Sequence, residues 1–264
     1  MDGTPVKALF TFALETEFAP WRKLRKFDKC NWGASEVWCT EVNGLSVAVL
    51  LTGAGANLAR AAVSEAIHSE YDSLRFCISS GLAGGLRPEH GTGQVLAARS
   101  VISEEGRAGD ASQVLDSSEP LVSFAAECGA AVVRRFLTMG RVVGRADEKN
   151  HLGASADAVE MESFGVLSAT QEKGIPAAAI RVISDRVDED LPLDMNEVLT
   201  DTGQVSIPRV LGQVARNPGA LPGLMRLGQD SKRAATALCE FLDRYVKRLA
   251  AAAQALEPKS AAGQ

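Results

Sequence analysis

The segment from Ala179 to Arg186, with the sequence AIRVISDR, constrains the fold more than any other stretch of the chain. It is mostly apolar and β-branched, and it ends abruptly in Ser184, Asp185 and Arg186. A continuous run of this kind is typical of a strand buried on both faces, as in the parallel sheets of α/β proteins. Ligands of such sheets bind beyond the carboxyl ends of the strands, so we expect Asp185 to point at a ligand. An ion pair with Arg186 or a turn-capping role explains the same residue without a ligand.

A second acidic cluster lies just upstream of this segment. Residues 159–163, with the sequence VEMES, end another apolar stretch and contain Glu160 and Glu162. Two strand ends that carry carboxylates and are joined by one helix predict a crevice for a polar ligand.

The overall composition is that of an ordinary globular protein. Of the 264 residues, 46% are hydrophobic and 23% are charged, and the formal net charge is -5. This length suits one large α/β domain or two small ones, and the core needs no disulfide or structural metal. The mildly acidic balance argues against a nucleic-acid partner.

Cysteines and histidines give no sign of a metal site. The five cysteines include no C-x-x-C pair, and the three histidines are far apart in the chain. Reduced thiols indicate a cytoplasmic protein. The apolar run near the start is too short and too soon acidic for a signal peptide. No segment approaches the ~20 apolar residues of a membrane span.

The first predicted strand, Val6 to Leu14, also ends in acidic residues. A helix is expected to follow through Pro20 to Phe27, since proline is tolerated in a first turn. Glu17 then lies where the strand gives way to the helix, at a carboxyl end like that of Asp185. An acid that complements the helix dipole explains Glu17 without a ligand.

Two glycine-rich turns are predicted to follow buried strands. The first, TGAGAN at residues 52–57, leads into a helix that ends near His68. The second, GLAGGL at residues 81–86, follows a strand over residues 75–80. Such turns let backbone N–H groups approach an anion or a sugar, and the missing GK[ST] sequence excludes a Walker loop.

The remaining elements fill out an α/β pattern. Strands are expected over residues 37–42 and 45–51, flanking the hairpin signal Asn43-Gly44, over 93–101 and within 132–143. Helices are expected over residues 120–129, 161–173, 205–214 and 221–249, and polar loops over 103–118, 144–156 and 187–201. We predict one domain over residues 1–250, with a helical C-terminal section from about 187 to 250 and a disordered tail over 251–264.

Five of these short stretches, taken in order, resemble the nucleoside phosphorylase/nucleosidase superfamily. They are ALETEF at 13–18, TGAG at 52–55, SGLAGG at 80–85, VEMES at 159–163 and VISD at 182–185. The resemblance covers residues 6–186 and is nearest, in its front half, to methylthioadenosine/S-adenosylhomocysteine nucleosidases. It implies an α/β fold with a three-layer mixed sheet, partly barrelled and flanked by helices. It also implies a homo-oligomer without a cofactor.

The family's reaction breaks the bond between a ribose C1' and a purine. By resemblance, Asp185 donates a proton to purine N7 and Glu17 activates the attacking water. Glu162 holds the ribose hydroxyls, and Met161 packs against the sugar. The same motifs add five further residues to the substrate site: Glu160, Ser184, Gly84, Ala83 and Gly55.

Water, rather than phosphate, is the nucleophile that the sequence favours. Phosphorolysis requires a cationic anion site, yet the approach to the second glycine turn reads Ile78-Ser79-Ser80, without the arginine typical of the phosphorylase branch. Three other arginines remain candidates for binding phosphate: Arg60, Arg87 and Arg145.

Three departures from the nucleosidase pattern bear on substrate choice. Leu82 stands where those enzymes usually carry serine. Ala146, Asp147 and Glu148 occupy the neighbourhood of the usual aromatic that stacks on the purine. The C-terminal stretch resembles the hopanoid-associated phosphorylase branch, in which four residues become candidates for an apolar channel or for ordinary helix packing: Leu221, Leu224, Met225 and Leu227.

The sequence therefore predicts a hydrolase that releases adenine from an adenosine derivative with an apolar or thioether group at the 5' carbon. The enzyme alternatives are phosphorolysis, or adenine removal from an adenosyl-hopane. The alternative of another class is an inactive member that binds a nucleoside.

Overall fold

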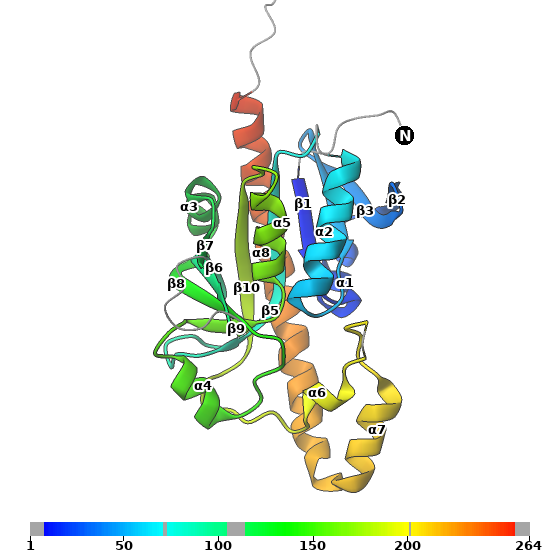
Figure 1. Ribbon diagram of the computed structural model, residues 1–264, viewed down its shortest axis with the longest axis vertical. Coiled ribbons are helices and arrows are strands. Elements are labelled where there is room, and N and C mark those ends of the chain that lie inside the picture. Colours follow the sequence, from blue (N-terminus) through cyan, green and yellow to red (C-terminus); the bar gives the residue numbers. More distant parts are fainter. Residues whose placement is uncertain (1–7, 71–72, 105–113, 201, 257–264) are drawn as a thin grey trace, which may run out of the picture.

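The computed structural model describes residues 8–70, 73–104, 114–200 and 202–256. Within them, ten strands form one mixed sheet in the order β10-β6-β8-β9-β5-β1-β4-β3-β2, with β7 paired to β6 (Figure 1). The strands are β1 (Ala8–Phe12), β2 (Asp28–Trp32), β3 (Ser35–Val42), β4 (Leu45–Leu51), β5 (Phe76–Gly85), β6 (Val95–Ser103), β7 (Val114–Asp116), β8 (Ala131–Thr138), β9 (Ala158–Glu160) and β10 (Ala177–Asp185).

One part of the sheet closes on itself. Strand β10 pairs with β6 and β5, and β8 and β9 connect β6 back to β5. Strands β1, β4, β3 and β2 continue from β5 as an open sheet. The prediction of a mixed, partly barrelled sheet is confirmed.

Helices cover both faces of this sheet (Figure 1). The α-helices of the described residues are α1 (Glu15–Leu24), α2 (Ala56–Glu70), α3 (Glu119–Glu127), α4 (Ala146–Leu152), α5 (Ser163–Gln171), α6 (Met195–Val198), α7 (Ile207–Arg216) and α8 (Leu221–Leu256). Of these, α6 and α7 lie below the sheet in the view of Figure 1. Alternate residues of β10 serve two cores. Ile180 and Val182 pack with α1, α3 and α8, while Ala179 and Ile183 pack with α2 and α5. This strand is buried throughout, as its apolar sequence predicts.

The predicted second glycine turn is wrong, because residues 81–85 continue strand β5. They pair with β10 on one side, and the last two pair with β9 on the other. A Cβ on Gly81, whose φ is +147°, would lie 2.4 Å from Nη1 of Arg181 and 2.9 Å from Oε1 of Glu17. Glycine is therefore needed here for the close approach of side chains and not for a turn.

The first glycine turn and the hairpin are as predicted. Asn43 and Gly44 have positive φ angles between β3 and β4, and Gly53 and Gly55 have positive φ angles between β4 and α2. A Cβ on Gly53 would lie 2.7 Å from the carbonyl oxygen of Thr202. The turn thus packs against the C-terminal section.

Several boundaries differ from the sequence prediction. Helix α1 begins at Glu15, so Pro20 lies inside it, where Phe18 and Trp21 anchor the helix in the core. The predicted loops 103–118 and 144–156 contain β7 and α4. Strand β2 was not predicted. Both β2 and β7 are short, and backbone pairing to a neighbouring strand holds them without an apolar run.

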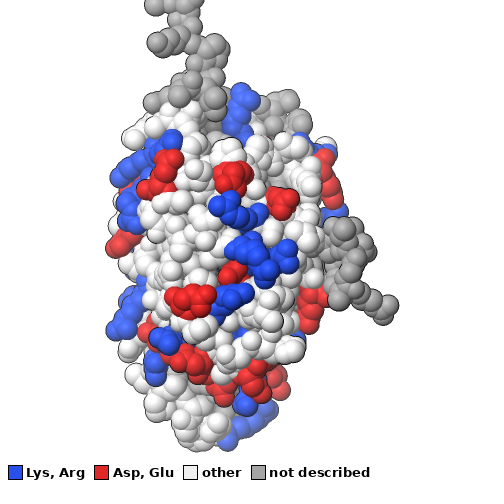
Figure 2. All heavy atoms as spheres, turned by 90° about the vertical axis from the view of Figure 1, so that its left-hand side faces the viewer, with Lys and Arg blue, Asp and Glu red and all other residues white. Residues whose placement is uncertain are grey.

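The predicted disordered tail is wrong for residues 251–256, which continue helix α8; residues 257–264 lie outside the described part of the chain. No helix among the described residues is long and apolar enough to cross a membrane. The described His, Cys, Asp and Glu side chains form no group suited to a metal ion. On the face shown in Figure 2, basic and acidic side chains are interspersed.

Candidate active site

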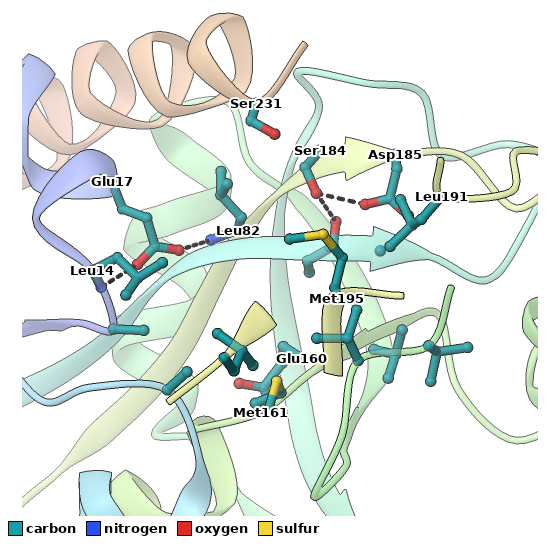
Figure 3. A pocket seen from close by; sticks show the side chains of 18 of the residues that line it. Leu14, Glu17, Leu82, Glu160, Met161, Ser184, Asp185, Leu191, Met195 and Ser231 are labelled. Atoms are coloured by element: carbon teal, nitrogen blue, oxygen red, sulfur yellow. Dashed lines mark hydrogen bonds between the residues drawn. The ribbon is translucent and has the colours of Figure 1, made fainter. Parts of the chain in front are cut away.

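The parallel strands β1, β5 and β10 end at the same edge of the sheet, and a pocket of about 220 Å³ opens there (Figure 3). Four carboxylates line it: Glu17, Glu160, Glu162 and Asp185. Of the nine residues that the sequence predicted for the site, all except Gly55 line this pocket. The first two turns of α1, the end of β9 and the end of β10 therefore converge as predicted.

Glu17 is held by backbone N–H groups from two elements. Its Oε1 accepts from the N–H of Leu82 at 2.9 Å, and its Oε2 accepts from the N–H of Leu14 at 2.9 Å (Figure 3). Burial raises the pKa of this carboxyl, although the Leu82 N–H and the Arg181 guanidinium oppose the rise. Leu82, where a serine was the family expectation, thus contributes through its backbone. The result is a fixed carboxyl group with increased basicity.

Glu162 joins the glycine turn to the buried charges below the pocket. Its Oε1 accepts from the N–H of Gly55 at 3.1 Å, and its Oε2 lies 3.3 Å from Nη2 of Arg181. Burial raises the pKa of Glu162 to about 8, with Arg181 opposing the rise and the nearby Glu160 and Glu17 adding to it. Gly55, which does not line the pocket, acts on the site through this bond. Near neutral pH the carboxyl is therefore available to donate as well as to accept hydrogen bonds.

Glu160 organises the backbone around Glu162. Its Oε2 accepts from the N–H groups of Glu162 and Ser163 at 2.9 and 2.7 Å, at the start of α5, and lies 2.6 Å from Nη2 of Arg181. Its Oε1 accepts from the hydroxyl of Thr138. Both oxygens already have protein partners, so Glu160 supports the pocket wall that carries Glu162 from behind.

Arg181, which the sequence did not single out, is the cation beneath these carboxylates. Its side chain is 1% exposed, and it also donates to the hydroxyls of Ser79 and Ser163 and to the carbonyl oxygen of Ser80. The hydrophobic pattern of β10 predicts a buried strand but gives no reason for a charged residue at position 181. Only the neighbouring carboxylates, distant in sequence, explain it.

Asp185 lies at the other side of the pocket, beyond the end of β10 (Figure 3). Its Oδ1 is 2.7 Å from the hydroxyl of Ser184, which is also 3.2 Å from the carbonyl oxygen of Ala83. Its Oδ2 is 2.5 Å from Nζ of Lys149. A Cβ on Gly84 would lie 3.2 Å from that same Oδ2, so the glycine leaves room for the carboxyl group. Asp185 does not pair with Arg186, whose guanidinium binds Asp188.

Lys149 was also missed by the sequence analysis. It stands between Glu148 and Asn150 in a stretch that reads as a polar loop, yet its side chain is 0% exposed. A single lysine with no apolar pattern around it gives no sequence signal. The fold of α4 alone brings it to Asp185.

The C-terminal section supplies an apolar wall. Six of its residues line the pocket: Leu191, Met195, Leu199, Val205, Leu227 and Ser231. Of the four residues proposed for an apolar channel, Leu227 lies in this wall, whereas Leu221 and Met225 are 47% and 61% exposed. Leu224 is half-buried and does not line the pocket.

The described lining of the pocket includes no aromatic residue, in keeping with the missing aromatic in the sequence. Val142 and Val143 belong to the lining, while Ala146, Asp147 and Glu148 lie outside it. The three arginines proposed for phosphate are also absent from it. Each of them pairs with a carboxylate elsewhere: Arg60 with Glu172, and Arg87 with Asp157. Arg145 pairs with both Asp147 and Asp190.

Comparisons with known proteins bear on the family and the fold of the chain. The family model for the phosphorylase superfamily matches residues 8–211. A futalosine hydrolase of Streptomyces coelicolor is 31% identical over 159 residues, which are 52% of this chain and 67% of that protein.

Solved structures share the fold across nearly the whole chain. A mutant of the futalosine hydrolase of Helicobacter pylori has a TM-score of 0.70 at 18% identity, covering 91% of this chain and 98% of that one. A mutant of the H. pylori methylthioadenosine nucleosidase, with 5'-methylthioadenosine in the active site, also has a TM-score of 0.70 at 18% identity. The match covers 91% of this chain and 98% of that one. The Neisseria meningitidis 5'-methylthioadenosine/S-adenosylhomocysteine nucleosidase has a TM-score of 0.69 at 19% identity, covering 91% and 98%. None of these comparisons tests the hopanoid-branch resemblance, which stays a prediction.

Proposed function

The chain belongs to the phosphorylase superfamily, and from this premise we propose that it is a purine nucleosidase. It hydrolyses the N-glycosidic bond of an adenosine derivative with an apolar or thioether group at the 5' carbon. The observation that carries the proposal is the placement of Glu17 and Asp185 in one pocket, held by different partners, with Glu162 in the same lining.

Asp185 acts on the leaving base. A purine anion is a poor leaving group, and a proton delivered to N7 as the bond to C1' breaks makes it a neutral one. The carboxyl group lies at the pocket edge, and Ser184 and Lys149 hold its two oxygens in place. This side of the pocket therefore holds the base.

Glu17 and Glu162 act on the water and the sugar. Glu17, whose pKa is raised by burial, accepts a proton from the attacking water. Glu162 binds ribose hydroxyls, and the acids nearby favour the positive charge that develops on the sugar. Met161, which lines the same part of the pocket, packs against the ribose.

Charge in the pocket supports water over phosphate. Four carboxylates line it, and Arg141 is the one arginine or lysine among the described lining residues, with its guanidinium paired to Glu148. Arg181 is already bound by Glu160 and Glu162. A phosphate dianion would lie beside the Glu17 carboxylate at the position of the nucleophile, and no unpaired arginine or lysine among the described lining residues would bind it.

The apolar wall supports an apolar 5' substituent. Leu191, Met195, Leu199, Val205 and Leu227 offer no charged partner to a 5' group. The adenosyl-hopane alternative rests on the same wall, because a polyterpene also needs an apolar surface. The length of the group that fits distinguishes a thioether from a polyterpene substrate.

Base release measures the proposed activity directly. The purified chain is incubated with methylthioadenosine, S-adenosylhomocysteine, futalosine and adenosine, and free base is measured by chromatography. We expect release from at least one 5'-substituted nucleoside. Binding of these nucleosides without any release would favour the inactive nucleoside-binding alternative. Release from a lipid-linked adenosine alone would favour the polyterpene substrate.

Asp185→Asn tests the role of the acid. The amide has the same shape but cannot donate a carboxyl proton, so we expect base release to fall roughly 10²- to 10⁴-fold. Circular dichroism and thermal melting check that the variant stays folded. Near-normal release from the folded variant would contradict the mechanism.

A further inference from the structure

Lys149 is a fully buried lysine whose three ammonium hydrogens all have acceptors next to the active site. Its Nζ lies 2.5 Å from Oδ2 of Asp185, 3.0 Å from the carbonyl oxygen of Arg186 and 2.8 Å from that of Glu189. Its side chain is 0% exposed. Of these acceptors, Asp185 alone carries a charge.

A buried ammonium group is costly unless it is paired, so a structural role alone would be met more simply by an apolar residue. Lys149 does connect α4 to the backbone that follows β10, through the two carbonyl oxygens. Those two bonds account for its position. They do not require the third bond, which goes to the carboxyl group that faces the pocket.

We propose that Lys149 is a positioning residue for the departure of the base, acting through Asp185. This inference rests on the proposed nucleosidase function. The ammonium group fixes the rotation of the Asp185 carboxyl and stabilises the carboxylate that remains once the proton has been given away. Negative charge that develops on Asp185 in the transition state thus meets a preformed cation in a dry site.

The step is balanced as follows. The O–H bond of the Asp185 carboxylic acid breaks, an N–H bond forms at the purine, and the bond between C1' and the base breaks with its electron pair going to the base. The carboxylate that is left pairs with the ammonium of Lys149. Glu17 takes the proton from water as the new C1'–O bond forms. After the products leave, Glu17 releases that proton to solvent and solvent returns a proton to Asp185.

Ser184 accommodates both states of Asp185. Its hydroxyl has one hydrogen and two neighbours, Oδ1 of Asp185 and the carbonyl oxygen of Ala83. It donates to the carboxylate after the reaction. Before the reaction it also donates to Oδ1, which leaves the acid proton of Asp185 directed at the base. Lys149 contacts the other oxygen, so the two partners divide the carboxyl group between them.

The test compares Lys149→Met and Lys149→Arg with the unmodified chain, on two kinds of substrate. One is the best purine nucleoside from the base-release assay; the other is p-nitrophenyl β-D-ribofuranoside, whose leaving group needs no proton. Lys26→Met is the matched control, because Lys26 is exposed and pairs only with Asp28. Thermal melting reports whether each variant is folded.

We expect Lys149→Met to lower kcat on the purine nucleoside about 10²-fold with little change in KM. Its activity on the nitrophenyl riboside should stay near that of the unmodified chain. Lys149→Arg, which keeps the charge, should recover most of the lost kcat. Lys26→Met should leave the activity on both substrates unchanged.

Equal losses on both substrates, or an unchanged or raised kcat on the purine nucleoside, would overturn the role of Lys149. A Lys149→Met chain that does not fold leaves the decision to Lys149→Arg: a loss on the purine nucleoside as large as that of Asp185→Asn would then contradict a role based on charge. Absence of base release from the unmodified chain is a different result, since it refutes the proposed function itself.

Discussion

Glu162 shows at the scale of one residue how burial changes both chemistry and stability. Its carboxyl binds the Gly55 N–H and lies beside Arg181, yet burial still raises its pKa to about 8. Glu17, a few ångströms along the same pocket wall, has its pKa raised for the same reason. In the unfolded chain both carboxyls return to ordinary values.

This difference predicts that stability falls with rising pH. Between about 4.5 and about 8 the folded chain holds more protons on Glu162 than the unfolded chain does, so the free energy of unfolding decreases as the pH rises through that window. Glu17 acts in the same direction. Urea denaturation at several pH values measures this decline. Glu162→Gln should make it shallower, and a slope unchanged by the substitution would count against a proton on Glu162.

Strand β10 shows at the scale of an element what the sequence could and could not predict. Its continuous apolar, β-branched run predicted a buried strand, and its terminal Ser184 and Asp185 predicted pocket residues, which the structure places in the lining. The acidic residues at the ends of β1 and β9 gave Glu17 and Glu162 by the same logic. These predictions succeed because periodicity and strand ends are local properties.

The failures concern contacts between distant segments. Arg181 looks anomalous inside an apolar strand, and only the fold brings Glu160 and Glu162 to it. Gly81 reads as part of a turn, although the closeness of Glu17 and Arg181 is what requires a glycine there. Lys149 becomes part of the site only because the fold brings α4 to the end of β10, where Lys149 binds Asp185. No window of sequence contains that information.

Arg181→Met tests the part that this strand plays in stability. The change leaves the buried carboxylate of Glu160 without its cation, and we expect a loss of about 3–5 kcal/mol in the free energy of unfolding. Arg99→Met is the control, since the Arg99–Glu119 pair is exposed, and it should cost no more than about 1 kcal/mol. Equal effects of the two substitutions in urea denaturation would show that the buried cluster is not needed for stability.

At the scale of the whole molecule, α7 has an apolar face that is exposed in the part of the chain that the structure describes. Ile207 and Leu211 are 64% and 62% exposed, and α7 has no buried residue. We expect the chain to form the homo-oligomer that the family resemblance implies, with this face in a contact between copies. Light scattering after gel filtration measures the mass. Leu211→Glu should lower it, with Thr236→Glu at an exposed position of α8 as the control. A monomeric unmodified chain would contradict the expectation.

The arrangement of the whole pocket favours water as the nucleophile in the proposed reaction, and the identity of the sugar product tests this most directly. The reaction is run on the best purine nucleoside in phosphate-free buffer and again with added phosphate, and the sugar is identified by mass spectrometry. The account predicts free sugar at the same rate in both. Strict dependence on phosphate, with a sugar 1-phosphate as the product, would contradict it and would make Glu17 a substrate contact instead of the base.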